Sequence, residues 1–81
     1  MDLEQIIKLL KSDSYKERAK GEYYFVKDKY EKLHNMIIKR EAGKLDFDPN
    51  CPLEQWKAQA AAMGNYLYQL EIKACMEGVE L

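Results

Sequence analysis

Aromatic and basic side chains are interleaved along the stretch GEYYFVKDKYEKLHNMIIKR, residues 21 to 40, whose overall pattern is that of a helix. Tyrosine rings offer faces on which a base can stack, and ammonium and guanidinium groups pair with phosphate. The residues here that could make such contacts are Tyr23, Tyr24, Lys27, Lys39 and Arg40. The mixture suits a small nucleotide. The alternatives are that the tyrosines border a core and that the lysines are only solvated, with Asp28 and Glu31 weakening any anion site.

Catalytic and metal chemistry has little support in the sequence. His34 has no second histidine to join it in a metal site, and Cys51 and Cys75 do not form a CxxC pair. We expect both cysteines to be free thiols, as in a reducing compartment. The four glycines are too widely separated to form a phosphate-binding loop. We therefore expect no catalytic residue, no metal site and no cofactor, and we predict that the protein is not an enzyme.

The charge balance limits the possible partners. The chain has 81 residues with 13 basic and 14 acidic side chains, which gives a formal net charge of −1. A chain so balanced is not expected to bind duplex nucleic acid. No run of apolar residues is long enough to cross a membrane, and the start MDLEQIIKLLKSD does not resemble a signal peptide. We expect a soluble protein of the cytoplasm.

The hydrophobic spacing predicts an all-α fold in one domain, residues 1–81. A short helix is expected over 3–11, and two long helices over 15–42 and 52–77. Each long helix carries one apolar seam at heptad spacing. The seam of the first long helix is Ala19, Tyr23, Val26, Tyr30, Leu33 and Ile37, and that of the second is Leu53, Trp56, Ala60, Met63, Leu67, Leu70 and Ala74. Two seams joined by a short loop predict a long antiparallel helical hairpin.

Apolar residues outside the seams predict a homo-oligomer. Eleven such residues are too many for a lone hairpin to cover, and large exposed apolar surfaces usually mark interfaces. They are Leu3, Ile6, Ile7, Leu10, Phe25, Met36, Ile38, Tyr66, Tyr68, Ile72 and Val79. The short helix could lie in a neighbour's groove. The alternative is a compact three-helix monomer in which this helix closes the core.

Two glycines interrupt the predicted long helices. Gly21 and Gly64 each cost about 1 kcal/mol relative to alanine inside a helix. Either the backbone approaches a ligand or another helix closely at these points, or the glycines are merely tolerated. The sequence leaves both interpretations open.

Short motifs resemble a family of small phage proteins that counter CBASS and Thoeris immunity, relatives of which are often described as crAss-phage-like. The motifs are Glu22-Tyr23, Lys32-Leu33, and then Gln59, Met63, Tyr66, Leu70 and Lys73. The resemblance covers about residues 15 to 79. It implies a short helix before a long antiparallel hairpin, assembly as a homohexamer, and a sponge that holds cyclic oligonucleotide or cyclic ADP-ribose-type messengers without cleaving them.

The resemblance also implies roles for individual residues. Tyr23 matches a base-stacking tyrosine, and Lys39 is the basic residue nearest to a phosphate-binding position that falls at Ile38. Lys73 stands where an arginine usually contacts a cyclic trinucleotide in a second pocket. With the neighbours noted above, the expected ligand-binding residues are Tyr23, Tyr24, Lys27, Lys39, Arg40 and Lys73. The main alternative is a helical adaptor that binds a phage or host protein through an apolar face. Single-stranded nucleic-acid binding is a third and weaker hypothesis.

Overall fold

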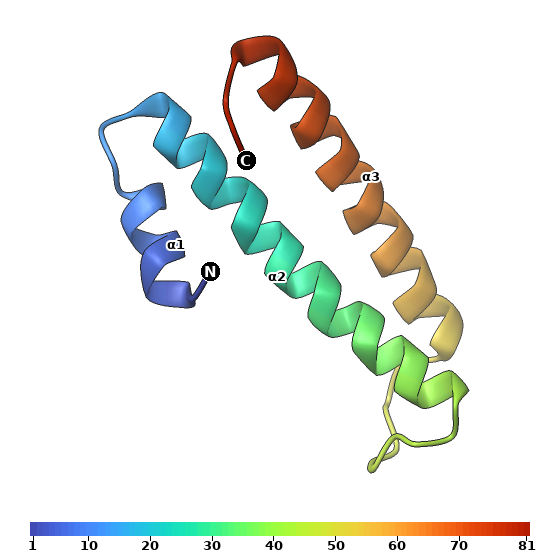
Figure 1. Ribbon diagram of the computed structural model, residues 1–81. Coiled ribbons are helices and arrows are strands. Elements are labelled where there is room, and N and C mark those ends of the chain that lie inside the picture. Colours follow the sequence, from blue (N-terminus) through green and yellow to red (C-terminus); the bar gives the residue numbers. More distant parts are fainter.

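The fold is all-helical, as predicted. A computed structural model describes residues 1–81 as three helices without strands. They are α1 (Leu3–Leu10), α2 (Tyr15–Glu41) and α3 (Leu53–Glu77). The two long helices lie side by side and run in opposite directions, joined by the loop between them (Figure 1). The expected ranges 3–11, 15–42 and 52–77 differ from these bounds by one residue at most.

Capping side chains fix where the helices begin. The Asp2 carboxylate accepts from the Gln5 N–H at 2.9 Å, and the Gln5 side chain accepts in return from the Asp2 N–H. Ser14 accepts from the Glu17 N–H at 3.4 Å, but the Glu17 carboxylate turns to the Ser12 hydroxyl. A reciprocal capping box at Ser14 is therefore only half formed.

Glycine fixes where the two long helices end. Gly43 and Gly78 have φ angles of 71° and 70°, in the left-handed region that favours glycine. After α2, the Lys44 N–H donates to the carbonyl of Lys39 at 2.8 Å. After α3, the Val79 N–H donates to the carbonyl of Ala74, also at 2.8 Å. Each end is thus a Schellman motif. Pro52 precedes α3 in an extended conformation.

The contact between α2 and α3 is built from the predicted seams. All thirteen seam residues are buried or half-buried, and Tyr23, Ile37, Leu67 and Ala74 are the most enclosed. Val79, expected outside the core, is buried as well, because the Schellman motif turns the chain back at Gly78. Only seven of 81 residues are buried, so this core is thin for its length.

Helix α1 packs against α2 and makes no contact with α3. In Figure 1 it lies beside the first half of α2, on the side away from α3. Ile6 is the anchor, with 2% of its surface exposed. A Cβ atom at Gly21 would lie 2.9 Å from the backbone nitrogen of Leu10, so glycine is what allows the two helices to approach. Helix α1 therefore covers one side of α2 and does not lie between the two long helices.

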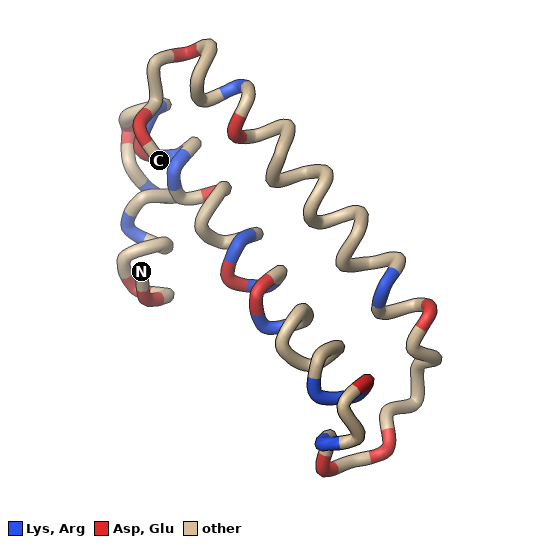
Figure 2. The backbone as a smooth tube through the Cα atoms, turned by 45° about the vertical axis from the view of Figure 1, so that its right-hand side comes forward, with Lys and Arg blue, Asp and Glu red and all other residues tan.

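Charge is distributed unevenly over the two long helices. Along α2, basic and acidic residues alternate, whereas the middle of α3, residues 58–70, carries no charge (Figure 2). Many large apolar side chains remain exposed, among them Leu3, Phe25, Ile38, Tyr68, Ile72 and Met76. None of the three helices combines the length and the apolar character that a membrane crossing requires.

Candidate functional site

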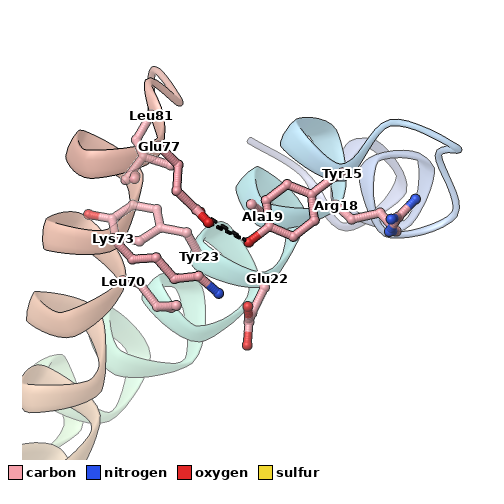
Figure 3. A pocket seen from close by; sticks show the side chains of 10 residues that line it. Tyr15, Arg18, Ala19, Glu22, Tyr23, Leu70, Lys73, Glu77 and Leu81 are labelled. Atoms are coloured by element: carbon pink, nitrogen blue, oxygen red, sulfur yellow. Dashed lines mark hydrogen bonds between the residues drawn. The ribbon is translucent and has the colours of Figure 1, made fainter.

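A cleft lies where the start of α2 meets the end of α3. It encloses about 530 Å³ of space, counting the part open to solvent. Figure 3 shows the side chains around it, from both helices and from the segment that follows α3. They are Tyr15, Arg18, Ala19, Glu22, Tyr23, Leu70, Lys73, Ala74, Glu77 and Leu81. Aromatic rings, apolar stems and both signs of charge therefore meet in one hollow.

Hydrogen bonds between tyrosines and glutamates cross from α2 to α3 around this cleft. In each pair a phenol donates to a carboxylate, and a bond to a charged acceptor is stronger than one between neutral groups. The pairs are Tyr15 with Glu77, Tyr23 with Glu71, and Tyr66 with Glu22. They fix the relative position of the two helices beside the thin apolar seam.

Tyr23 is the most enclosed of these tyrosines. It is 7% exposed, and its hydroxyl donates to Glu71 Oε2 at 2.6 Å. Burial, followed by the hydrogen bond and the charge of Glu71, raises the pKa of Tyr23 to about 12. The edge of its ring meets the ring of Tyr24, with centroids 5.2 Å apart. Within one chain Tyr23 therefore forms the floor of the cleft and does not present an open face for stacking.

Tyr15 presents its ring more openly. This residue is 48% exposed, and its hydroxyl lies 3.0 Å from both carboxylate oxygens of Glu77. The Lys73 ammonium lies 5.8 Å from the centre of the ring. The pKa of Lys73 is raised above its usual value, first by the Tyr15 hydroxyl and further by the negative charge of Glu77 and Glu22. These neighbours favour the charged form of Lys73.

Arg18 contributes its stem to the cleft rather than its charge. Its guanidinium donates to the carbonyl of Ser12 at 2.9 Å and points away from Lys73 and Glu77 (Figure 3). The charges that face the hollow are therefore one ammonium and the carboxylates of Glu22 and Glu77. With Glu77 in its observed position, the local balance does not favour an anion.

Tyr24 and Lys27 line a second hollow, with Met1, Asp28 and Glu31. The Lys27 ammonium lies 5.8 Å from the ring centre of Tyr23 and 5.9 Å from that of Tyr24. These three expected site residues are therefore neighbours. Asp28 forms an ion pair with Lys32 at 2.9 Å, which partly offsets its charge.

Lys39 and Arg40 lie towards the opposite end of α2. Sixteen residues of helix separate Tyr23 from Lys39, which corresponds to about 24 Å. Arg40 also has local partners, because its guanidinium lies 4.8 Å from the centre of the Trp56 ring and donates to the carbonyl of Cys51 at 2.9 Å. One chain therefore does not bring these two residues to the same small ligand as Tyr23 and Lys73.

The sequence argument missed Tyr15, Glu22 and Glu77 as site residues. A usable signal was present, since Tyr15 and Glu22 are seven residues apart on α2, as are Tyr66 and Lys73 on α3. Such spacing places polar residues in a row beside an apolar seam. Both cysteines are free, and both are exposed. No three His, Cys, Asp or Glu side chains are grouped closely enough to hold a metal ion.

Comparison with known families identifies a match over most of the chain. The family described as Sequestin matches residues 13–73, which include all of α2 and most of α3. The matched range contains Tyr15, Glu22, Tyr23 and Lys73 from the cleft, whereas Glu77 and Leu81 lie beyond it. No similar curated protein and no similar solved structure was found.

Proposed function

The chain belongs to the Sequestin family, whose name indicates sequestration, and from this premise we propose that it captures a small anionic signalling molecule by binding alone. The proposed ligand is a cyclic dinucleotide, a cyclic trinucleotide or a cyclic ADP-ribose isomer. The proposed setting is the cytoplasm of a bacterial cell infected by a phage, where removal of the messenger would silence an immune response.

The cleft that brings Tyr15, Tyr23 and Lys73 together carries this proposal. An exposed aromatic ring beside an ammonium group offers the two contacts that every nucleotide can use, stacking for its base and charge for its phosphate. Tyr15 and Lys73 lie on different helices, and the seam beneath them holds both in place. A preformed pair of this kind lowers the ordering cost of binding.

Capture without cleavage is the proposed mode of action. A sponge needs only to be abundant and to bind its messenger well below the signalling threshold, and nanomolar affinity corresponds to about 12 kcal/mol. Bound and free messenger remain the same molecule in this scheme. No residue is assigned a part in breaking a bond.

Self-association, and a homohexamer in particular, is part of the proposal. The uncharged stretch 58–70 of α3 and the exposed apolar side chains supply surface that a second copy could cover. Charged side chains are depleted at the centres of such interfaces, which fits this stretch. Buried area from neighbouring copies would also offset the thin core of the single chain.

Assembly would give Lys39 and Arg40 a place in ligand binding. Lys39 and Arg40 lie about 24 Å from Tyr23 along α2. They could contact the same ligand as Tyr23 only if they came from a neighbouring chain. We propose that Tyr24 and Lys27 of one copy, beside the buried Tyr23, face Lys39 and Arg40 of another. Lys73 would act in the cleft of its own chain.

A helical adaptor is the second candidate. Tyr68, Ile72 and Met76 follow one another along the outer side of α3 and are exposed. A partner helix could pack along such a strip without any small ligand. The adaptor would bind its partner with no messenger present.

A depletion experiment tests the proposal. Each messenger is mixed with excess protein, the protein is removed by ultrafiltration, and the free messenger is quantified. We expect one messenger to disappear from the filtrate and to return unchanged after heat denaturation. If every messenger in the panel stays in the filtrate, the adaptor is favoured. If a messenger is depleted but is recovered in cleaved form, capture by binding alone is contradicted.

A further inference from the structure

We propose that Glu77 is a built-in competitor for the phosphate of the captured molecule, an inference that rests on the proposed function of the cleft. Its carboxylate accepts the hydrogen bond of the Tyr15 hydroxyl, and its negative charge acts on the Lys73 ammonium without forming an ion pair with it. A bound phosphate takes over the hydrogen bond from Tyr15 and pairs with Lys73, and Glu77 swings out of the cleft.

The contacts of Glu77 are those that a phosphate would make. Both of its carboxylate oxygens lie 3.0 Å from the Tyr15 hydroxyl, which has one proton to donate. Lys73 is four residues earlier on α3, so the two side chains share one face of the helix. Phosphate oxygens are acceptors for the same phenol and the same ammonium group. Figure 3 shows the carboxylate reaching across the cleft to Tyr15.

The position of Glu77 on α3 is unfavourable for the helix itself. It is the last residue of α3, where the partial negative charge of the helix end repels a carboxylate, and no basic residue stands in that last turn. The helix end therefore disfavours an acidic residue here, and the hydrogen-bond partner of Glu77 is Tyr15 across the cleft.

The segment after Glu77 is fastened independently of this carboxylate. Gly78 turns the chain back, Val79 is buried, and the Val79 N–H is bonded to the carbonyl of Ala74. The Lys16 ammonium reaches the carbonyl of Gly78 at 3.5 Å. Rotation of the Glu77 side chain can therefore open the cleft while the backbone around it stays in place. Since Tyr15 is half exposed, the hydrogen bond that must break lies at the solvent-exposed surface.

The competitor also resolves the charge conflict in the cleft. With Glu77 inward, one ammonium group faces two carboxylates. With Glu77 outward, Tyr15 and Lys73 form a donor pair, and Glu22 remains engaged with Tyr66. An anion thus binds to a cleft that has lost one negative charge.

Inorganic pyrophosphate is the probe that tests this inference. Its binding is followed through the NMR signals of ¹³C-labelled tyrosine rings. The signal of Tyr15 is assigned as the one missing from the Tyr15→Phe variant. Glu77→Gln keeps the length and an acceptor for Tyr15 but removes the charge. Glu80→Gln removes the same charge from an exposed position three residues later and serves as the control. We expect Glu77→Gln to lower the dissociation constant of pyrophosphate about tenfold and Glu80→Gln to leave it within about twofold of the unaltered protein.

Equal affinities in the unaltered protein and Glu77→Gln would overturn the inference, as would a Tyr15 signal that moves in neither protein. The proposed function can fail separately. If no messenger binds but pyrophosphate behaves as expected, the competitor stands and the assignment of a messenger falls. If a messenger binds both proteins equally, capture stands and the competitor is wrong.

Discussion

The Tyr23 hydroxyl donates to Glu71 Oε2 at 2.6 Å, so the residue that the sequence singles out as a stacking platform also ties α2 to α3. Its ring belongs to the seam and its polar end is already paired. This dual position sets what a substitution at Tyr23 would do to the fold and to the ligand site.

We expect Tyr23→Phe to lower the free energy of unfolding by about 1 kcal/mol, because the ring is kept while one hydrogen bond to a carboxylate is lost. Urea unfolding followed by circular dichroism measures the change. Tyr68→Phe is the matched control, since the Tyr68 hydroxyl makes no hydrogen bond within the chain and the side chain is exposed. An equal effect of both substitutions would contradict a special role for the Glu71 contact.

The same pair predicts a loss of stability in alkali. The pKa of Tyr23 in the folded protein is about 12, against an ordinary value of 10.0, so folding favours the neutral phenol. This contribution is complete below about pH 10 and is lost as the pH rises towards 12. We expect the stability advantage of the unaltered protein over Tyr23→Phe to shrink between these values in urea titrations. An advantage that stays constant or grows with pH would show that Tyr23 is not protected from ionisation.

The two helical glycines should respond in opposite ways to alanine. A Cβ at Gly21 would press on the backbone and side chain of Leu10 at 2.9 to 3.1 Å, so we expect Gly21→Ala to cost about 1–3 kcal/mol. A Cβ at Gly64 would lie 3.5 Å from the Tyr30 ring, an ordinary contact, and Gly64→Ala should gain up to about 1 kcal/mol from helix propensity. Urea unfolding of both variants decides the matter. A Gly21→Ala variant that is as stable as the unaltered protein, or more stable, would refute the tight docking of α1 at Gly21.

Much of this architecture could be predicted because it depends on local spacing. Heptad positions identified the seams, and Gly43 and Gly78 marked the ends of the long helices. The docking of α1 could not be predicted, since its stripe of leucines and isoleucines fits any apolar groove. Its actual partner is the surface around Gly21.

The site was predicted less completely than the fold. Tyr23 and Lys73 were found because each belongs to a recognisable motif, and both line the cleft. Glu77 was not, because its partner Tyr15 is 62 residues away and the pairing depends on the register between α2 and α3. The loop that sets this register has no sequence pattern from which the register follows.

Arg40 is expected to stabilise the fold whether or not it also binds a ligand. Arg40→Lys would remove the planar group that lies over Trp56 and its hydrogen bond to Cys51, at a cost of about 1 kcal/mol. Urea unfolding, with Trp56 fluorescence as the signal, measures the change. Lys39→Gln alters the exposed neighbour and should leave stability unchanged. If Arg40→Lys also leaves the free energy of unfolding unchanged, the contact with Trp56 does not stabilise the end of the hairpin.

Isothermal titration tests the central claim most directly. The unaltered protein and the Lys73→Ala variant are each titrated with cyclic dinucleotides, cyclic trinucleotides and cyclic ADP-ribose isomers. Lys8→Ala, which removes an exposed lysine from α1, is the control for charge. We predict tight binding of one messenger, recovery of that messenger intact, a loss of affinity of roughly tenfold or more in Lys73→Ala, and no loss in Lys8→Ala. Absence of binding across the panel by a folded protein, or binding that Lys73→Ala leaves unchanged, would contradict capture in the cleft.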